Sequence, residues 1–259
     1  AVSVDRLVRE LSAASPWLAW TAAILAGLAV LALLVLILRE LAAVARLRRV
    51  EALRRAEAAA RVGGSVPQAR EVCARLRALY AGRRDVAVDW RRLAEQADDA
   101  MDAGARIALY ERRVLEPLDA EARAAVRQAA RRVSIVTALA PSLLLDAAAA
   151  LYLNAAMIRR LAEIYGGRAG LAGTIRLARR VVAHAMAMGL IALTDDMLEP
   201  LLGGGVAAKV SRRLGEGVVN GAMTARLGLA AMEVCRPLAF EALPKPSLRE
   251  VMWDALRKR

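Results

Sequence analysis

The chain has 259 residues, of which 58% are apolar but only 3% aromatic. Alanine, leucine and valine supply most of the apolar content, and the aromatic and β-branched clusters that mark strands are nearly absent. We therefore predict an all-α fold. The formal net charge is +13, which is typical of nucleic-acid binding, of attraction to anionic lipid or of the positive-inside bias of membrane proteins.

Nucleic-acid binding is the weakest of these three explanations. It usually brings a recognisable module or aromatic stacking platforms between the basic residues, and neither is seen. The only two cysteines, Cys73 and Cys235, stand far apart and outside any metal-ligand spacing. We expect them to be small buried residues in a reducing compartment. No cofactor or metal is predicted.

The first element in chain order is an uncharged apolar run at residues 16–38. A hydrocarbon core is crossed by about 20 helical residues, so residues 17–38 predict a transmembrane helix. A signal peptide would be shorter and end in a cleavage site, and a buried helix of a soluble core is seldom this long and apolar. Trp17 and Trp20 are expected at one membrane interface. The basic residues expected at the other interface are Arg39, Arg46, Arg48 and Arg49.

The charges on either side of this run predict its orientation. Only Arg6 and Arg9 precede it, whereas a dense series of arginines follows it. The positive-inside rule therefore places the chain after residue 38 on the cytoplasmic side of a bacterial inner membrane. We expect the helix to continue as a basic stalk to Gly63, either solvated with one packed stripe or lying near anionic head groups. Residues 1–62 thus form an anchor and stalk.

A cytoplasmic helical subdomain is predicted for residues 63–118. Its amphipathic pattern favours three helices, at about residues 66–80, 89–103 and 105–116. Gly82, Gly104 and Pro117 are expected to separate these helices.

Residues 119–240 are predicted to form an apolar helical domain. Residues 133–158 are long enough to span a membrane, but they contain Pro141, Asp146 and Asn154. Polar residues at membrane depth usually face a bundle interior or a water-filled site. Arginines flank both ends, so a full span would push one basic flank outward. We expect a helical hairpin buried in protein or dipping into one leaflet, with a second span as the close alternative.

The next predicted helix, about residues 173–198, contains the single histidine, His184, and ends at Asp195 and Asp196. Behind it come small residues that allow helices to approach closely. They are Gly215, Gly217, Gly221, Ala222, Ala225, Gly228 and Ala231. In the last segment, 241–259, Ser247 and Glu250 have the spacing of a capping box and predict a short terminal helix.

Residues with catalytic chemistry are few. His184 has no metal-ligand or acid–base partner at a suitable spacing, and we expect it to be a core residue. The string GGGVAAKVS is no phosphate-binding loop, because glycine must directly precede the lysine and serine or threonine must follow it. Asp195 and Asp196 fit an ion-pair network better than a cation site. Their candidate partners are Arg212, Arg213 and Arg226. We therefore expect that the protein is not an enzyme.

Three strings carry a resemblance to a known family. They are EPLDAEARAAVRQAARRVSIVTALAP at 116–141, RLAEIYGGRAG at 160–170 and RLGEGVVNGAMTARLGLAAMEVCRPLAF at 213–240. Together with LILREL after the apolar run, they resemble the YcjF-like family of bacterial inner-membrane proteins, which share a carboxy-terminal domain of unknown function. Ala140 and Ala169 depart from residues common in that family, which are Ser and Pro.

The resemblance implies two amino-terminal spans, and only one is visible here. We therefore expect the sequence to start in a periplasmic loop that follows a first span. It also implies a P-loop NTPase or GTPase partner, in the context of envelope stress. Other candidate partners are anionic lipid head groups and a second copy of the chain in a homo-oligomer.

Within the same strings, several polar residues are candidates for interaction sites or buried polar contacts. Glu216 and Asn220 lie four residues apart, on one helix face among small residues. Arg236 precedes Pro237 at a helix terminus. The complete candidate set is Asp146, Asn154, Arg168, Asp195, Asp196, Glu216, Asn220, Arg226 and Arg236. Packing explains these residues as well as ligand binding does.

Three functions remain open at this point. The leading one is a membrane-anchored, non-enzymatic interaction or scaffold protein. The second is a channel-like or membrane-remodelling protein that uses residues 133–198. The third, ranked last, is a membrane-tethered nucleic-acid binder.

Overall fold

The computed structural model describes residues 16–83, 86, 88–99, 102–166, 171–187 and 206–256, with some side chains left out within residues 16–48 and those of residues 171–172, 206–214 and 253–256 left out. These residues form helices and no strand, which confirms the all-α prediction. The helices are α2 Pro16–Gly63, α3 Val66–Tyr80, α4 Trp90–Asp98, α5 Ala103–Tyr110, the π-helical turn η1 Glu111–Leu115, α6 Glu116–Leu139, α7 Leu143–Ile164, α8 Leu171–Ala187, α9 Val206–Cys235 and α10 Leu248–Leu256.

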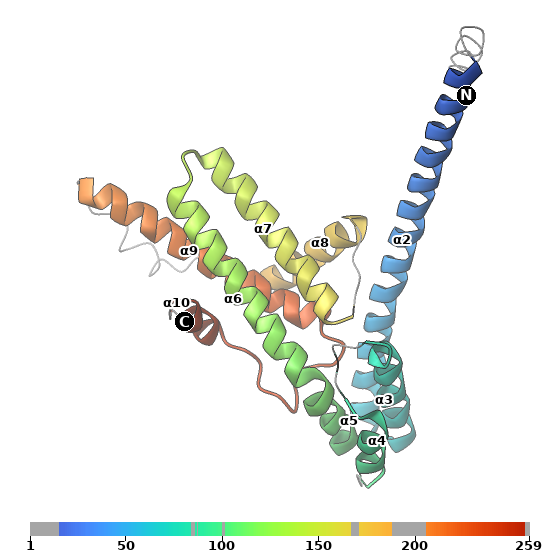
Figure 1. The fold of residues 1–259 in the computed structure, drawn as a ribbon. Helices are drawn as coiled ribbons and strands as arrows, with labels where there is room; N and C mark the ends of the chain where they lie inside the picture. Colours follow the sequence, from blue (N-terminus) through green and yellow to red (C-terminus); the bar gives the residue numbers. More distant parts are fainter. Residues whose placement is uncertain are drawn as a thin grey trace.

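Helix α2 is continuous, as the absence of a helix breaker predicted. It ends at Gly63, and Gly64 adopts a left-handed φ of 58° that favours glycine. Its carboxy-terminal half presents a buried stripe that includes Val50, Leu53 and Ala60. Its amino-terminal half stands apart from the other helices (Figure 1). The packed stripe predicted for this part of the helix is therefore present, and its position near anionic head groups stays a prediction.

The described part of α2 does not by itself establish a membrane span. Taken over the described residues alone, none of the helices combines the length and the apolarity needed to cross a membrane. The transmembrane assignment of residues 17–38 is therefore not confirmed and stays a prediction. The large apolar side chains described there, including Trp17, Trp20 and Leu28, are exposed.

Helices α3, α4 and α5 form a small array against the carboxy-terminal half of α2 (Figure 1). The predicted helix at 66–80 matches α3, whereas the one predicted at 89–103 ends as α4 at Asp98. Asp89 and Asp102 accept backbone hydrogen bonds at the starts of α4 and α5.

Two expected breaks between helices are wrong. Gly104 lies in the first turn of α5, and Pro117 does not interrupt the run from Ala103 to Leu139. Proline is tolerated in the first turn of a helix, where its missing N–H leaves no intrahelical bond unmade. The π-helical η1 carries the chain into α6, which begins one residue before Pro117.

Helices α6 and α7 form a hairpin around Pro141, as expected for residues 133–158. The tip of this hairpin is exposed. The first alternative, a hairpin buried in protein, is therefore wrong for the tip. Helix α9 packs closely along α6. A Cβ atom added at Gly217 would lie 2.5 Å from the Ser134 carbonyl oxygen, and a Cβ atom added at Gly228 would lie 2.5 Å from the Val126 side chain. The predicted close approach at these small residues is therefore confirmed.

One hydrophobic core joins almost the whole described chain, from Leu53 on α2 to Val251 on α10. The domain boundary drawn between residues 118 and 119 falls inside a continuous helical run and has no counterpart in this core. The Ser247 backbone N–H donates to the Glu250 carboxylate and the Glu250 backbone N–H donates to the Ser247 hydroxyl, so the predicted capping box forms at the start of α10.

Candidate functional site

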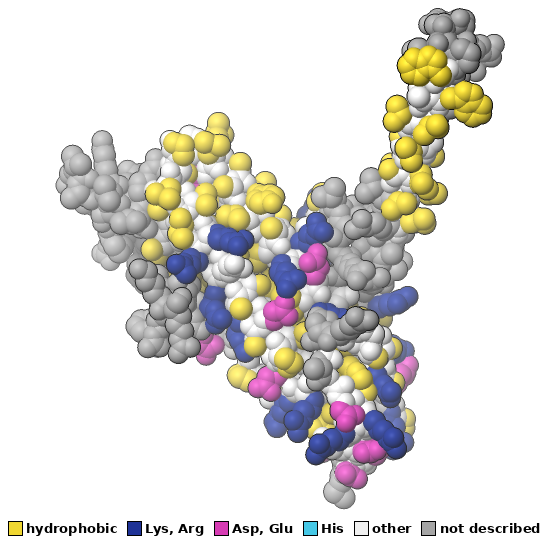
Figure 2. All heavy atoms as spheres, in the orientation of Figure 1, with side chains coloured by type: hydrophobic (Ala, Val, Ile, Leu, Met, Phe, Trp, Pro, Cys, Tyr) yellow, Lys and Arg dark blue, Asp and Glu magenta, His cyan; other side chains and the backbone are white. Residues whose placement is uncertain are grey.

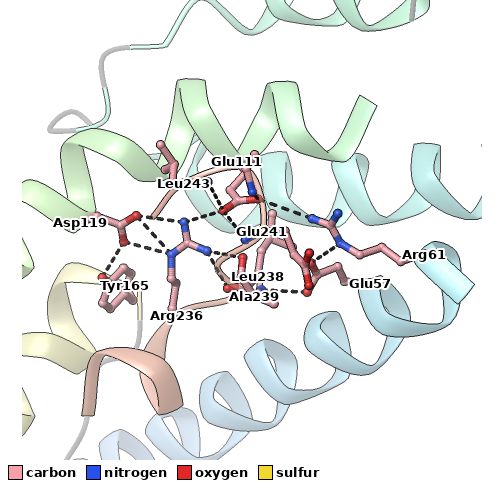
Figure 3. A network of polar contacts seen from close by, with 11 residues as sticks. Glu57, Arg61, Glu111, Asp119, Tyr165, Arg236, Leu238, Ala239, Glu241 and Leu243 are labelled. Carbon is pink, nitrogen blue, oxygen red and sulfur yellow. Dashed lines mark hydrogen bonds and ion pairs between the residues drawn. The ribbon is translucent and has the colours of Figure 1, made fainter. Parts of the chain in front are cut away.

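Arg236 follows directly after α9 and is completely buried. Its Nε donates to both carboxylate oxygens of Asp119, at 3.1 and 3.2 Å, and its Nη2 donates to Asp119 at 2.9 Å and to Glu111 at 3.2 Å. Its Nη1 donates to the carbonyl oxygens of Leu238 and Ala239. All three guanidinium nitrogens thus have acceptors (Figure 3), as a buried arginine requires.

Glu111 is the second buried centre of this network, and it lies at the first residue of η1. Its carboxylate accepts hydrogen bonds from the backbone N–H groups of Glu241, Ala242 and Leu243 at 3.0–3.3 Å. Successive N–H groups of an irregular segment form a concave site for an anion. Here the anion is a side chain of the same chain, so Glu111 holds the segment between α9 and α10 in place.

Asp119 and Tyr165 form the third part. The Tyr165 hydroxyl donates to Asp119 at 2.7 Å, and the Tyr80 hydroxyl donates to the backbone oxygen of Tyr165 at 3.1 Å. Burial, followed by the negative charge of Asp119, raises the pKa of Tyr165 well above its usual 10. Burial alone would lower the pKa of Arg236, but the hydrogen bonds and charges of Asp119 and Glu111 outweigh it and raise that pKa.

Helix α2 joins the same network through Glu57 and Arg61. Glu57 accepts from the backbone N–H of Ala239 at 2.9 Å, across 182 residues of sequence. Arg61 donates to Glu57 at 2.8 Å and lies 3.5 Å from Glu111. The guanidinium of Arg236 also lies 3.9 Å from the Phe240 ring centroid. We call the set Glu57, Arg61, Glu111, Asp119, Tyr165 and Arg236 the Arg236 network.

A second polar cluster lies near the tip of the α6–α7 hairpin. The Thr137 hydroxyl donates to Asp146 at 2.6 Å, and the amide nitrogen of Asn220 donates to Thr137 at 3.1 Å and to Asp146 at 3.4 Å. Thr137 is buried, and Asp146 and Asn220 are half-buried. The structure thus brings together two predicted candidates, Asp146 and Asn220, from two different helices. We call these three residues the tip triad.

The other predicted candidates are scattered. Asn154, Glu216 and Arg226 are half-buried on α7 and α9. Trp17, Trp20 and Arg49 are exposed on α2. Outside the described residues lie Arg168, Asp195 and Asp196, together with the side chains of Arg39, Arg46 and Arg48.

His184 has a partner that sequence spacing did not reveal. Its Nε2 lies 3.2 Å from Glu233 on α9, and Glu233 also pairs with Lys245 at 2.7 Å. The histidine is half-buried rather than in the core. Cys73 and Cys235 are buried free thiols, as predicted. Burial raises the pKa of both thiols to about 12, which keeps them protonated and unreactive at neutral pH.

The chemistry available to these sites is limited. In the part of the chain that the structure describes, no three His, Cys, Asp or Glu side chains are arranged to hold a metal ion. The buried charges of the Arg236 network are engaged with one another and with backbone groups. Such an arrangement cross-links α2, the η1–α6 turn and the segment after α9.

Sequence reasoning singled out Arg236 but missed the other five members of the network, which are Glu57, Arg61, Glu111, Asp119 and Tyr165. A signal was present, because each of the three strings that carried the resemblance contains one member of the network. These members are Asp119 in 116–141, Tyr165 in 160–170 and Arg236 in 213–240. Glu57 and Glu111 lie outside those strings and had no such signal.

The chain is similar to proteins of a known family. Residues 101–259 match the family described as Domain of unknown function (DUF697). The chain is 46% identical to a UPF0283 membrane protein of Sinorhizobium medicae over 251 residues, which cover 97% of the chain and 70% of that protein. It is 44% identical to a UPF0283 membrane protein of Brucella canis over 253 residues, 98% of the chain and 71% of that protein.

The chain belongs to the UPF0283 membrane protein family. The names of its UPF0283 relatives support a membrane location and state no activity. They do not mention an NTPase, so the more specific resemblance to YcjF-like proteins and the NTPase association are not confirmed. No solved structure matches the chain significantly.

Proposed function

We propose that this protein is a membrane-anchored, non-enzymatic interaction protein. Residues 17–38 of α2 cross the bilayer, and the helical domain lies in the cytoplasm, where it docks a partner. The observation that carries the proposal is the contrast within α2, which is apolar and exposed in its first half and bonded into the domain in its second. The family's membrane location is consistent with it.

The first half of α2 has the surface of a membrane anchor. Its described side chains from Trp17 to Leu38 include many large apolar groups that no other part of the described chain covers. Such a surface is unfavourable in water and favourable in lipid. The two exposed tryptophans sit near the amino-terminal end, where aromatic rings suit an interface.

The second half of α2 is tied to the domain by polar contacts to distant segments. Glu57 and Arg61 join the Arg236 network, and Arg54 lies 3.5 Å from the backbone oxygen of Val234. Glu51 pairs with Arg180 of α8 at 3.1 Å. A stiff helix bonded in this way holds the domain at a defined distance from the bilayer, which suits a scaffold better than a flexible linker would.

The buried polar groups support a structural role rather than catalysis. A catalytic site needs polar groups that converge on a space where a reacting atom can sit. The charges of the Arg236 network converge on each other instead, and the thiols of Cys73 and Cys235 stay protonated.

The partner that we propose is a P-loop NTPase or GTPase, on the basis of the resemblance to the YcjF-like family. The test is to purify the tagged full chain in mild detergent and identify the proteins that remain bound by mass spectrometry. We expect one NTPase in near-stoichiometric amount. Finding no NTPase with the intact chain would contradict this part of the proposal.

A comparison variant, Arg236→Met, keeps the anchor but destabilises the domain by removing its central cation. We expect this variant to reach the membrane and to lose the NTPase. An NTPase that binds both forms equally would be recognising the anchor alone, or the detergent micelle, and would count against docking by the domain.

A second candidate, a membrane-remodelling protein, is favoured by the exposed apolar tip of the α6–α7 hairpin. Thiol accessibility of single cysteines along residues 133–187 tests both functions. Labelling from the periplasmic side anywhere in that stretch would rule out a domain that lies wholly in the cytoplasm.

A further inference from the structure

The tip of the α6–α7 hairpin exposes a cluster of large apolar side chains. Leu143 and Leu144, at the start of α7, are 81% and 84% exposed. The cluster comprises Ile135, Leu139, Leu143, Leu144, Leu145, Leu151 and Tyr152. Figure 2 shows apolar side chains gathered over the upper ends of α6 and α7. A contiguous apolar patch of this kind marks a surface that another phase or molecule covers.

Several polar side chains at this tip are paired with other groups of the protein. Asp146 and Asn220 bond to each other and to Thr137 within the tip triad. The Ser142 hydroxyl accepts from the backbone N–H of Leu145 at 3.4 Å and caps the start of α7. Lipid can satisfy no hydrogen bond, so a segment that enters it must pair its polar groups internally. The tip meets this requirement at these positions.

Basic side chains follow the apolar cluster on both helices. Arg131 and Arg132 are exposed on α6. Arg159 and Arg160 are exposed on α7, where Glu163 and Glu121 neutralise them in part. At 1.5 Å per residue, these arginines lie about 12 Å from the tip along α6 and about 24 Å along α7. The two values bracket the ~15 Å of one hydrocarbon leaflet and stay below the ~30 Å of a full core.

The tip also lies toward the same end of the molecule as the apolar half of α2 (Figures 1 and 2). Both helices rise from the Arg236 network, where Arg61 meets Glu111. The apolar surface begins about 28 Å along α2, counted from Glu57 to Leu38, and about 36 Å along η1 and α6, counted from Glu111 to Ile135. A single bilayer can therefore meet both surfaces.

We propose that the α6–α7 tip inserts into one leaflet of the bilayer, as a second membrane contact beside α2. Its apolar cluster enters the acyl chains, and Arg131, Arg132, Arg159 and Arg160 lie among anionic head groups. The arginines favour this occupant over an apolar protein partner or a second copy, since neither calls for a basic rim. The inference rests on the proposed function only in taking α2 as the anchor on the same side.

The test places an environment-sensitive nitrobenzoxadiazole dye on the full chain, through the substitution Leu144→Cys. The buried thiols of Cys73 and Cys235 are poor targets at pH 7, and the unsubstituted chain shows how little dye they take up. The labelled protein is reconstituted in vesicles of phosphatidylcholine with about 30% phosphatidylglycerol, an anionic lipid whose surface potential attracts Lys and Arg. Lipids brominated at shallow or deep acyl positions then quench any dye that contacts them.

Two matched positions serve as controls. Leu28→Cys reports on α2, and Ala124→Cys, which is exposed on α6 on the domain side of Arg131, reports on a surface in water. We expect quenching of the dye by at least twofold at Leu144, more by shallow than by deep bromines. We expect strong quenching at Leu28 and little at Ala124.

The outcomes separate this inference from the proposed function. Quenching at Leu28 but not at Leu144 would overturn the inference and leave the anchor intact. Quenching at Leu144 without quenching at Leu28 would overturn the anchor instead. A dye at Leu144 that shifts to the blue without being quenched would show a protein covering the tip, and labelling of Leu144→Cys from the opposite side would show a full span. Either result overturns insertion into one leaflet.

Two further variants test the apolar cluster and the basic residues separately. Leu143→Asp, added to Leu144→Cys, places a charge at an exposed position, so the fold should persist while the quenching is lost. Arg131→Gln with Arg132→Gln should reduce quenching in the anionic vesicles and change little in vesicles of phosphatidylcholine alone. If the labelled chain that keeps Arg131 and Arg132 were quenched equally in both vesicle types, the role given to the anionic head groups would be contradicted.

Discussion

The two ends of the helical run from η1 through α6 contrast in charge and burial. At the η1 end, Glu111 and Asp119 are buried charges that meet Arg236 in a closed network. At the Leu139 end, Ile135 and Leu139 are exposed, while Thr137 pairs internally with Asp146 of α7. Charge is thus buried in protein at one end, and apolar surface is exposed at the other.

The two ends are therefore suited to different surroundings. Buried carboxylates persist only where cations and N–H groups replace water, and the segment after α9 supplies both at the η1 end. Exposed leucines persist where the surrounding phase is itself apolar, which the lipid of the proposed tip insertion provides. The same run of helix therefore connects a buried junction to an exposed apolar tip.

Replacing the central cation should produce the largest effect. Arg236→Met leaves the carboxylates of Asp119 and Glu111 buried without their cation, and we expect a loss of about 3–5 kcal/mol in the free energy of unfolding. Urea denaturation of the detergent-solubilised chain measures it. Arg160→Met removes an exposed ion pair with Glu121 and should cost less than about 1 kcal/mol. Equal losses in the free energy of unfolding would show that the buried network stabilises the fold no more than an exposed ion pair does.

The middle of α6 can be tested through its contact with α9. A methyl group at Gly217 would lie 2.5 Å from the Ser134 carbonyl oxygen, so Gly217→Ala must push the two helices apart. We expect a loss of about 1–3 kcal/mol in the free energy of unfolding. Gly82→Ala meets no atom within 4 Å and serves as the control, with a change of about 0.5 kcal/mol or less. A neutral Gly217→Ala would contradict the close packing.

Alkaline pH should destabilise the folded chain through its two buried thiols. In the unfolded chain the thiols of Cys73 and Cys235 lose their protons near pH 9, whereas the pKa of each in the folded chain is about 12. The folded state therefore holds more protons above pH 9. Its stability is complete below pH 9 and falls as the pH rises toward 12, by at most about 1.4 kcal/mol per thiol and pH unit.

Denaturation at pH 8, 9 and 10.5 measures this slope. The double variant Cys73→Ala with Cys235→Ala should flatten it, while an exposed thiol added by Leu144→Cys at the tip should not steepen it. The raised pKa of Tyr165 adds a fall of the same sign above pH 10. A double variant with an unchanged slope would contradict the burial of the thiols.

The smallest expected effect lies at the tip itself. Leu144→Ala removes an exposed side chain and should change the free energy of unfolding by about 0.5 kcal/mol or less. Leu115→Ala, at the fully buried end of the run from η1 through α6, should cost about 2–5 kcal/mol. Denaturation in identical micelles compares the two. A large loss from Leu144→Ala would place that residue in a protein contact and remove the contrast between the ends.

Much of the local structure followed from sequence pattern. Gly63 and Gly64 end α2, residues 66–80 form α3, and Ser247 with Glu250 caps α10. These features depend on neighbours within a few residues, which the sequence displays directly. The role of Pro117 was mistaken because a proline that ends one helix and a proline in the first turn of the next have the same local pattern.

The candidate sites were harder to foresee. Arg236 was recognisable as a polar residue at a helix end, but its partners Asp119 and Glu111 lie 117 and 125 residues away. Asp146 was seen as a costly polar residue, and only the folded hairpin showed that Thr137 and Asn220 satisfy it. His184 was considered partnerless, yet Glu233 meets it from another helix. No spacing rule reports such pairs.

By itself, the sequence determined an all-helical chain, a helix that runs unbroken from an apolar half into a basic half, and small residues where α9 packs against α6. Periodicity, capping and side-chain size act over short range, so they can be read one segment at a time. Only the tertiary structure decided which charges meet in the Arg236 network and which leucines remain uncovered at the tip. Both depend on how distant segments pack, because burial and pairing are properties of the whole fold.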